Sequence, residues 1–295
     1  LFIDSGGLTN MRGKYKEPIE SDIRRITLIY GKFKPTRFLP LDFPPTISMS
    51  IAEKTARWRS TFRSTQIMLR SMSETNQSID GLTPVVHAFS EKSLRIVLYD
   101  ETVGIFRLAD WKNIALGAQK PLLQKMTFLP VFGKIFCNTV VKLREMVGDD
   151  MWIHVLAAGG EKTLPLVYYL GADSADTNSW YTAGIHGKVT IPGSGAHKWL
   201  YPWRKPLPRN APLSDLERRS LENCQCEVCR QIDAEGQFHV LTNDLVVRLR
   251  HNLYVTLMHS SMLQRLPRAE IAKWIKSRQR RSCLWPVYEY ALRRF

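Results

Sequence analysis

The sequence is organised around a cysteine-rich stretch, Asn223-Cys224-Gln225-Cys226-Glu227-Val228-Cys229, which is followed downstream by Arg250-His251-Asn252-Leu253-Tyr254. Three thiols lie within six residues, and 21 residues separate Cys229 from His251. Zinc binds four ligands in a tetrahedron, and Cys₃His is one of its structural ligand sets. Because the chain has only five cysteines among 295 residues, this clustering predicts a structural Zn²⁺ site. The spacing leaves the fourth ligand open between His251, His239 and His259.

The overall composition is that of a globular protein with one large domain or two ordinary ones. No apolar run reaches the length of a membrane-spanning helix, and the first residues show neither the basic region nor the cleavage site of a signal peptide. The two remaining cysteines, Cys137 and Cys283, are isolated in the sequence. Thiols that are reserved for a metal indicate a reducing, cytoplasmic location.

The formal net charge of +15 predicts a polyanionic partner, most commonly nucleic acid, with an acidic membrane surface as the alternative. The positive charge is concentrated in two clusters, and a solvated helix face is the simpler explanation for either one alone. One cluster consists of Lys54, Arg57, Arg59, Arg63 and Arg70. The other consists of Arg265, Arg268, Lys273, Lys276, Arg278, Arg280, Arg281, Arg293 and Arg294. Two clusters together with the overall excess favour contacts with phosphate groups.

Short apolar runs that end in Gly, Asp or Pro alternate with helical patterns along the first part of the chain, as in parallel βα units. Six strands are expected, within residues 1–3, 37–42, 84–89, 113–118, 152–160 and 172–176. Helices are expected at about 18–30, 50–72, 136–147 and 165–170. A closed (β/α)₈ barrel needs eight strands. The sequence therefore predicts either an open doubly wound sheet or a barrel whose first two strands lie upstream of Leu1, and the abrupt start favours the barrel.

The character of the sequence changes after Asp176. Residues 188–212 are rich in Pro, Gly, Trp and basic residues, which predicts a loop-rich insertion leading to the cysteines. Helical patterns follow at 241–264 and at 269–295, with an expected interruption at Pro286. The expected domains are a barrel domain at 1–187, a zinc-binding subdomain at 188–262 and a basic C-terminal helix at 263–295.

Four motifs in this order resemble the tRNA-guanine transglycosylases, especially the archaeal type, and their relatives that insert 7-deazaguanines into DNA. They are Asp4-Ser5-Gly6-Gly7, Asp42 before Pro44-Pro45, Gly171-Ala172-Asp173-Ser174-Ala175-Asp176, and the cysteine stretch with its downstream His251-Asn252-Leu253. The resemblance extends from Asp4 to the last helix. It implies a TIM barrel, an inserted zinc subdomain, and His251 as the fourth zinc ligand. The six expected strands then correspond to strands three to eight of the barrel.

The resemblance also implies how the chemistry is divided. Base exchange at a nucleoside needs a nucleophile at C1′ and a group that moves protons at the bases, and two carboxylates can do this. By similarity, Asp176 is the nucleophile that forms a covalent ribosyl intermediate, and Asp4 is the general acid/base. Both lie at expected C-terminal strand ends, where barrel active sites are built. Alone, either aspartate is more simply explained as a helix cap or turn residue, and Asp173 is expected to be structural.

The base-binding residues implied by the resemblance are Asp42, His87, Gly117 and Ser5. His87 stands where the tRNA enzymes usually carry Gln, and a buried core histidine is the simpler alternative at this position. Gly117-Ala118 replaces a pair of glycines, and Ala175 replaces an aromatic residue. These departures put the identity of the incoming base in doubt more than the type of reaction.

The expected function is a transglycosylase that exchanges guanine in a nucleic acid for a 7-deazaguanine base. DNA is favoured over tRNA because no separate RNA-binding domain follows the last helix and because the pocket is altered. The alternatives are a transglycosylase that acts on tRNA and a non-catalytic partner subunit, although such a subunit is expected to lack Asp4 or Asp176. The sequence leaves the oligomeric state open, with a homodimer among the options.

Overall fold

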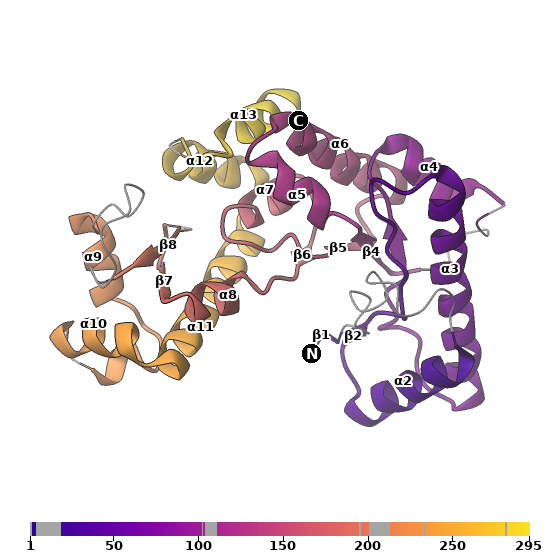
Figure 1. Ribbon diagram of the computed structural model, residues 1–295, viewed down its shortest axis with the longest axis horizontal. Coiled ribbons are helices and arrows are strands. Elements are labelled where there is room, and N and C mark those ends of the chain that lie inside the picture. The colour runs from indigo at the N-terminus through magenta and orange to yellow at the C-terminus, as the bar shows by residue number, and fades with distance from the viewer. Residues whose placement is uncertain are drawn as a thin grey trace. The chain divides into compact units, whose positions relative to one another are not determined.

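The computed structural model describes residues 2–3, 19–101, 103, 111–194, 196–200, 213–232, 234–280 and 282–295 (Figure 1). The chain forms two compact units. The first comprises Leu1–Ala158, Leu170–Ala175 and Glu289–Phe295, and the second comprises Gly159–Tyr169 and Asp176–Tyr288. Each unit has its own cluster of buried apolar side chains.

Parallel strands form the sheets of the first unit. They are β1 (Phe2–Ile3), β2 (Arg37–Phe38), β3 (Val85–His87), β4 (Asn113–Gly117), β5 (Trp152–Val155) and β6 (Ser174–Ala175). β3 to β6 pair in chain order in a four-stranded parallel sheet, and β1 pairs in parallel with β2. A parallel bridge between Phe38 and Leu82 connects β2 with the segment just before β3. The six expected strands are therefore present, in the expected order.

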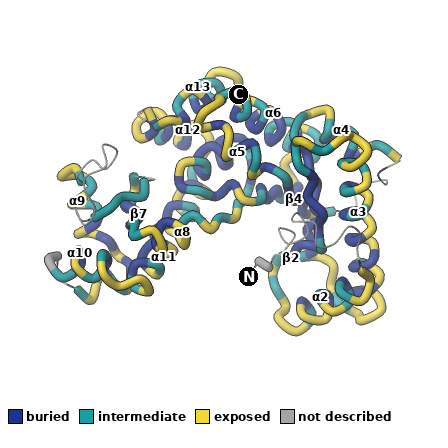
Figure 2. Tube along the Cα trace, in the orientation of Figure 1, coloured by how far each residue is buried: buried dark blue, intermediate teal, exposed yellow. Residues whose placement is uncertain are grey.

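Helices separate these strands, as a parallel sheet requires. They are α2 (Glu20–Phe33), α3 (Ile51–Glu74), α4 (Glu91–Tyr99), α5 (Lys120–Met126) and α6 (Pro130–Val147). α3 begins with a capping box, in which Ser50 and Glu53 bind each other's backbone N–H groups. Every residue of β3 and β4 is buried, as expected for strands that are covered on both faces (Figure 2).

The second unit is mainly helical around one antiparallel hairpin. Its helices are α7 (Leu164–Tyr169), α8 (Ser179–Ile185), α9 (Asp215–Glu222), α10 (Ala234–Asn243), α11 (Leu245–Arg265) and α12 (Arg268–Arg278), and α13 (Trp285–Arg294) begins in it. The hairpin consists of β7 (Lys188–Ile191) and β8 (Ala196–Trp199). Val189, Ile191, Leu221 and Leu241 pack together with the three clustered cysteines.

The structure corrects the sequence-based expectations at three places. α5 lies between the expected strand at 113–118 and the expected helix at 136–147, where no helix was predicted, and the loop-rich insertion contains the hairpin β7–β8. Pro286 does not interrupt the last helical stretch, because α12 ends at Arg278 and α13 begins at Trp285. Proline in the first turn of a helix lacks only an N–H that would be unpaired there in any case.

Within the described residues, the fold is a mixed α/β fold with a four-stranded parallel sheet and twelve α-helices. No ladder joins β6 to β1 in this part of the chain, so a closed barrel is not present in it. None of its helices combines the length and the apolar composition needed to span a membrane.

Candidate functional site

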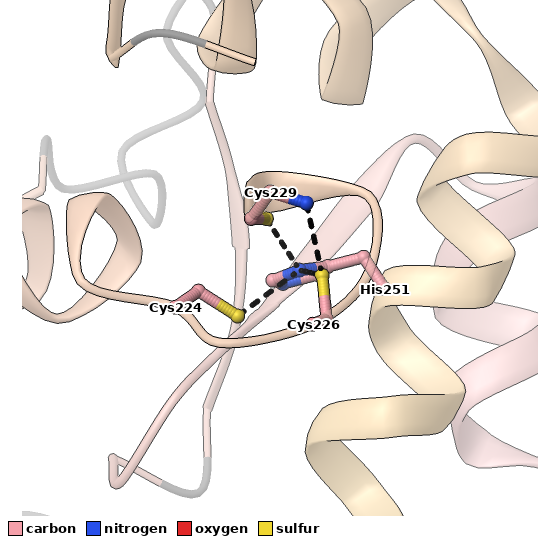
Figure 3. A group of neighbouring side chains, drawn as sticks. All are labelled: Cys224, Cys226, Cys229 and His251. Carbon is pink, nitrogen blue, oxygen red and sulfur yellow. Dashed lines mark hydrogen bonds between the residues drawn. The ribbon is translucent and has the colours of Figure 1, made fainter. Parts of the chain in front are cut away.

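The four predicted metal ligands come together in the second unit (Figure 3). Cys224 and Cys226 lie in the loop after α9, Cys229 begins a short 3₁₀ turn, and His251 lies on α11. Their ligand atoms are all within 4.8 Å of one another, and all four residues are buried. His239 and His259, the alternative fourth ligands, are not part of this cluster.

The spacing of the ligand atoms fits a single zinc ion. His251 Nδ1 is 3.7 Å from the Sγ atom of Cys224, 3.5 Å from that of Cys226 and 3.3 Å from that of Cys229. Ordinary Zn–S and Zn–N bonds at tetrahedral angles place sulfur and nitrogen roughly 3.6 Å apart. Hydrogen bonds from Cys224 and Cys229 lower the pKa of the Cys226 thiol, and the same interactions raise the pKa of Cys229. A thiolate is the form that binds a metal.

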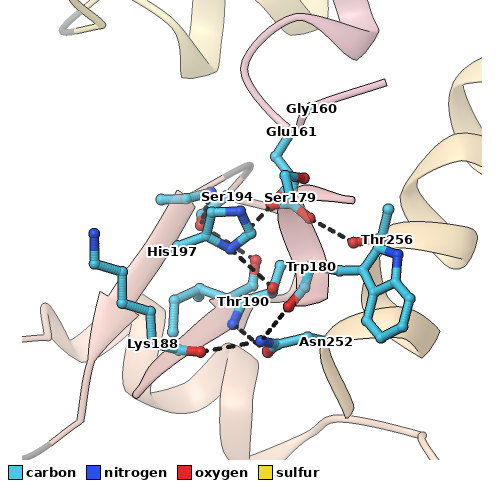
Figure 4. A network of polar contacts seen from close by, with 12 residues as sticks. Gly160, Glu161, Ser179, Trp180, Lys188, Thr190, Ser194, His197, Asn252 and Thr256 are labelled. Atoms are coloured by element: carbon cyan, nitrogen blue, oxygen red, sulfur yellow. Dashed lines mark hydrogen bonds and ion pairs between the residues drawn. The ribbon is translucent and has the colours of Figure 1, made fainter. Parts of the chain in front are cut away.

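The other ring nitrogen of His251 fixes the tautomer that metal binding needs. Nε2 lies 2.9 Å from the carbonyl oxygen of Thr190, which can only accept a hydrogen bond, so Nε2 carries the proton. Nδ1 then presents its lone pair to the three sulfurs. The neighbouring Asn252 accepts from the Thr190 N–H at 2.8 Å and donates to the Lys188 carbonyl at 3.0 Å (Figure 4). The metal cluster and the hairpin therefore share one hydrogen-bond network.

A buried acidic group that sequence reasoning missed adjoins this network (Figure 4). Glu161 accepts from Thr256 Oγ1 at 2.5 Å, and its other oxygen is 3.7 Å from His197 Nδ1. His197 Nδ1 lies 3.0 Å from the hydroxyl oxygen of Thr190. Burial raises the pKa of Glu161 to about 7 and lowers the pKa of His197 to about 4. Glu161, His197 and Thr256 belong to no motif that the sequence analysis identified. Asn252, by contrast, follows His251 in the motif His251-Asn252-Leu253.

Three of the predicted base-binding residues lie together in the first unit. Asp42 comes four residues after β2, His87 ends β3, and Gly117 ends β4 directly opposite His87 in the parallel ladder. His87 Nε2 is 3.1 Å from Asp42 Oδ2, and the two side chains are 1% and 7% exposed. The three residues occupy the C-terminal ends of successive strands, where parallel sheets bind ligands.

Gly117 is required at its position by the ring of His87. A Cβ atom on Gly117 would lie 2.2 Å from Nδ1 and 2.5 Å from Cε1 of that ring, which is far inside van der Waals contact. The imidazole therefore covers the glycine, and a larger residue would displace it. The register of β3 against β4 sets this close approach, which the sequence alone could not show.

The same place contains buried polar atoms without hydrogen-bond partners. Neither nitrogen of His87 forms a hydrogen bond, because its 3.1 Å contact with Asp42 lacks the required geometry. Gln119 donates through Nε2 to the carbonyls of Ala88 at 2.6 Å and Gly117 at 2.8 Å, but its Oε1 is buried and has no partner. Such groups are rare in folded proteins and mark functional sites or bound water. Gln119 was not singled out from the sequence.

The predicted nucleophile, Asp176, and the predicted general acid, Asp4, are not among the described residues that the structure brings together around His87. Asp176 directly follows β6, is exposed, and belongs to the second unit, where its carbonyl oxygen accepts from the Gly159 N–H at 2.8 Å. Asp4 and Ser5 lie outside the described residues. Asp173 binds Arg144 at 2.5 Å and the Ile153 N–H at 2.7 Å, so its carboxylate ties β5 to β6.

Two groups of side chains are therefore candidates for function. One is the Cys₃His cluster, which fits a zinc site, and the other is the buried group of Asp42, His87 and Gly117. A search of protein-family models found no match to the chain, and a search of curated proteins found none either.

Proposed function

We propose that this chain is a transglycosylase that exchanges guanine in a nucleic acid, with DNA favoured over tRNA, for a 7-deazaguanine base. The observation that carries the proposal is the meeting of Asp42, His87 and Gly117, which are far apart in the sequence. The Cys₃His cluster supports it, because both groups belong to the same expected architecture. In that architecture β1 to β6 are strands three to eight of a TIM barrel.

In the proposed reaction, Asp176 and Asp4 act in turn. The carboxylate of Asp176 attacks C1′ of the target nucleotide, and the bond from C1′ to the guanine breaks while Asp4 protonates the leaving base. Asp4, now ionised, removes a proton from the incoming 7-deazaguanine. The freed nitrogen attacks C1′, and the bond to Asp176 breaks, so that both carboxylates regain their first state. Two displacements retain the configuration at C1′, as in retaining glycosidases.

The remaining residues bind rather than react. The carboxylate of Asp42 accepts hydrogen bonds from the N–H donors of the base, and His87, Gly117 and Ser5 line the same site. Zinc, held by Cys224, Cys226, Cys229 and His251, stabilises the fold and takes no part in the reaction. The target base must leave its stack to reach such a site, so the substrate is a flipped or single-stranded nucleotide.

The test is nucleoside mass spectrometry after incubation of the protein with isotopically labelled guanine and either duplex DNA or tRNA. We expect label in DNA, and we expect Asp176→Asn to reduce its incorporation on the order of 10³-fold or more, as loss of a nucleophile does. Asp173→Asn is the matched control, because its carboxylate binds Arg144 and should affect stability but not exchange by folded protein.

Each other outcome is informative. Label that enters only tRNA would replace DNA by tRNA as the substrate. Unchanged incorporation by Asp176→Asn would remove this residue from the nucleophile's role. If neither nucleic acid acquires label, the chain does not catalyse the proposed exchange, and a role as a non-catalytic partner subunit takes its place.

A further inference from the structure

Helix α3 presents a row of arginines to solvent. Successive residues of an α-helix are 100° apart, so Arg59, Arg63 and Arg70 point within about 40° of one another. All three are exposed. At 1.5 Å per residue, the row is about 16 Å long. We call these three residues the arginine face of α3.

Packing on the opposite side of the helix fixes the direction of this face. Met68 lies about 180° from Arg59 around the helix axis. It is fully buried and belongs with Ile67 to a cluster that also contains Ile23 and Tyr30 of α2. Rotation of α3 would expose these apolar side chains to water. The arginine face is therefore held outward by the core of the unit.

The structure divides the basic cluster that the sequence suggested. Lys54 lies on another side of α3, where Nζ donates to the Ile47 carbonyl at 2.9 Å and stands 5.7 Å from the centre of the Phe89 ring. Arg57 is half-buried. The other three basic residues of the cluster are exposed and form one continuous surface.

Few acidic residues accompany these basic ones along helix α3. Residues 54–73 contain no Asp or Glu. Of the two carboxylates at the ends, Glu53 closes the capping box, and Glu74 binds Arg24 of α2 at 2.5 Å and also attracts Arg70. An ordinary solvated helix face mixes both signs, as α12 does where Lys273 binds Glu270 at 2.7 Å.

We propose that the arginine face of α3 binds the phosphate backbone of a nucleic-acid strand, an inference that rests on the proposed function and assigns a surface to its substrate. Guanidinium groups bind phosphate through two parallel hydrogen bonds and remain charged at every physiological pH. Arg59 and Arg63 are about 6 Å apart along the axis, and Arg63 and Arg70 about 10 Å. With one phosphate per roughly 3.4 Å of a stacked strand, these intervals correspond to about two and three nucleotides. Such contacts hold the strand without reading its sequence.

The experiment measures binding of a fluorescently labelled 20-nucleotide single strand of mixed sequence by anisotropy at several salt concentrations. We expect the triple variant Arg59→Gln, Arg63→Gln, Arg70→Gln to bind at least about 10-fold more weakly at low salt. The slope of log K against log salt should fall by about 2, because each lost phosphate contact removes about 0.7. Circular dichroism and the unfolding midpoint verify that the variant is folded.

The matched control removes the same charge elsewhere on the unit, through Lys32→Gln, Lys92→Gln and Lys120→Gln at exposed positions. Equal weakening by both triple variants would reduce the effect to net charge and overturn the proposal. Normal binding of the single strand by the arginine variant would overturn it as well. Loss of binding to phosphatidylserine vesicles, with normal binding of DNA, would assign the face to a lipid surface instead.

The binding result and the exchange result are independent. Binding needs no chemical step, so weakened binding in a protein that exchanges no base would refute the proposed function and leave the arginine face assigned. Exchange by a triple variant that also binds normally would support the function and refute the assignment of the surface.

Discussion

Two buried histidines, one in each unit, are used in opposite ways. His251 is fully buried, and both of its nitrogens have partners, with Nδ1 facing three sulfurs and Nε2 bound to the Thr190 carbonyl. His87 is 1% exposed, and neither of its nitrogens forms a hydrogen bond, although Asp42 is 3.1 Å away. The rings are equally hidden from water, but only one of them is satisfied by the fold.

This difference indicates that His251 has a structural role and that His87 is available to bind a ligand. A buried polar atom without a partner costs about 1–3 kcal/mol, so a fold that keeps several together sacrifices stability. Both ring nitrogens of His251 contribute to one network that includes the hairpin. Around His87, the unpaired atoms include Gln119 Oε1. We infer that the metal cluster serves folding and that the Asp42–His87 site serves binding.

The largest expected effect tests the structural half of this comparison. His251→Ala removes one zinc ligand and the hydrogen bond to Thr190, and structural zinc contributes on the order of 10 kcal/mol to small domains. We expect loss of bound zinc and of the cooperative unfolding transition of the second unit. Metal analysis and thermal unfolding measure this, with Cys283→Ser, an exposed thiol outside the cluster, as the control. A variant with full zinc and an unchanged midpoint would contradict a structural role.

An intermediate effect is expected at the other histidine. Gly117→Ala places a methyl group against the ring of His87, and overpacking of this kind costs about 1–3 kcal/mol. Chemical denaturation measures the loss, and Gly160→Ala is the control, because its nearest contact would be 3.3 Å away at Thr163 Oγ1. If the ring is the obstacle, His87→Ala in the same chain should recover part of the loss. Additive losses in the double variant would show that the two residues are not coupled.

The last expected effect appears only as a change with pH and concerns the acidic group beside the metal network. Burial raises the pKa of Glu161 from 4.5 to about 7, so the folded protein retains a proton that the unfolded chain releases between these pH values. Its contribution to stability is complete below pH 4.5 and is lost as the pH rises towards 7. Glu161→Gln cannot titrate, so its unfolding free energy relative to the wild type should rise by about 2 kcal/mol between pH 5.5 and 7.5. A constant difference across this range would show that Glu161 does not titrate there.

Local patterns in the sequence were enough to predict much of the fold. Alternating apolar runs and turn residues predicted all six parallel strands, and helical spacing predicted a helix at about 50–72, where α3 lies. The prediction of a helix interruption at Pro286 was wrong. Pro286 was expected to break a helix and instead stands in its first turn, because the effect of a proline depends on its position in the helix.

The sequence by itself determined which reactive and charged groups are present: three closely spaced thiols with a downstream histidine, a cluster of positive charge along α3, and acidic residues at strand ends. These features depend on residue type and short spacing, which the chain carries before it folds. The structure confirmed His251, which the resemblance implied, as the histidine beside the thiols. Only the tertiary structure decided that His87 covers Gly117 and that Glu161 lies buried beside His197. Contacts between distant segments depend on strand register and helix packing, and no single segment contains that information.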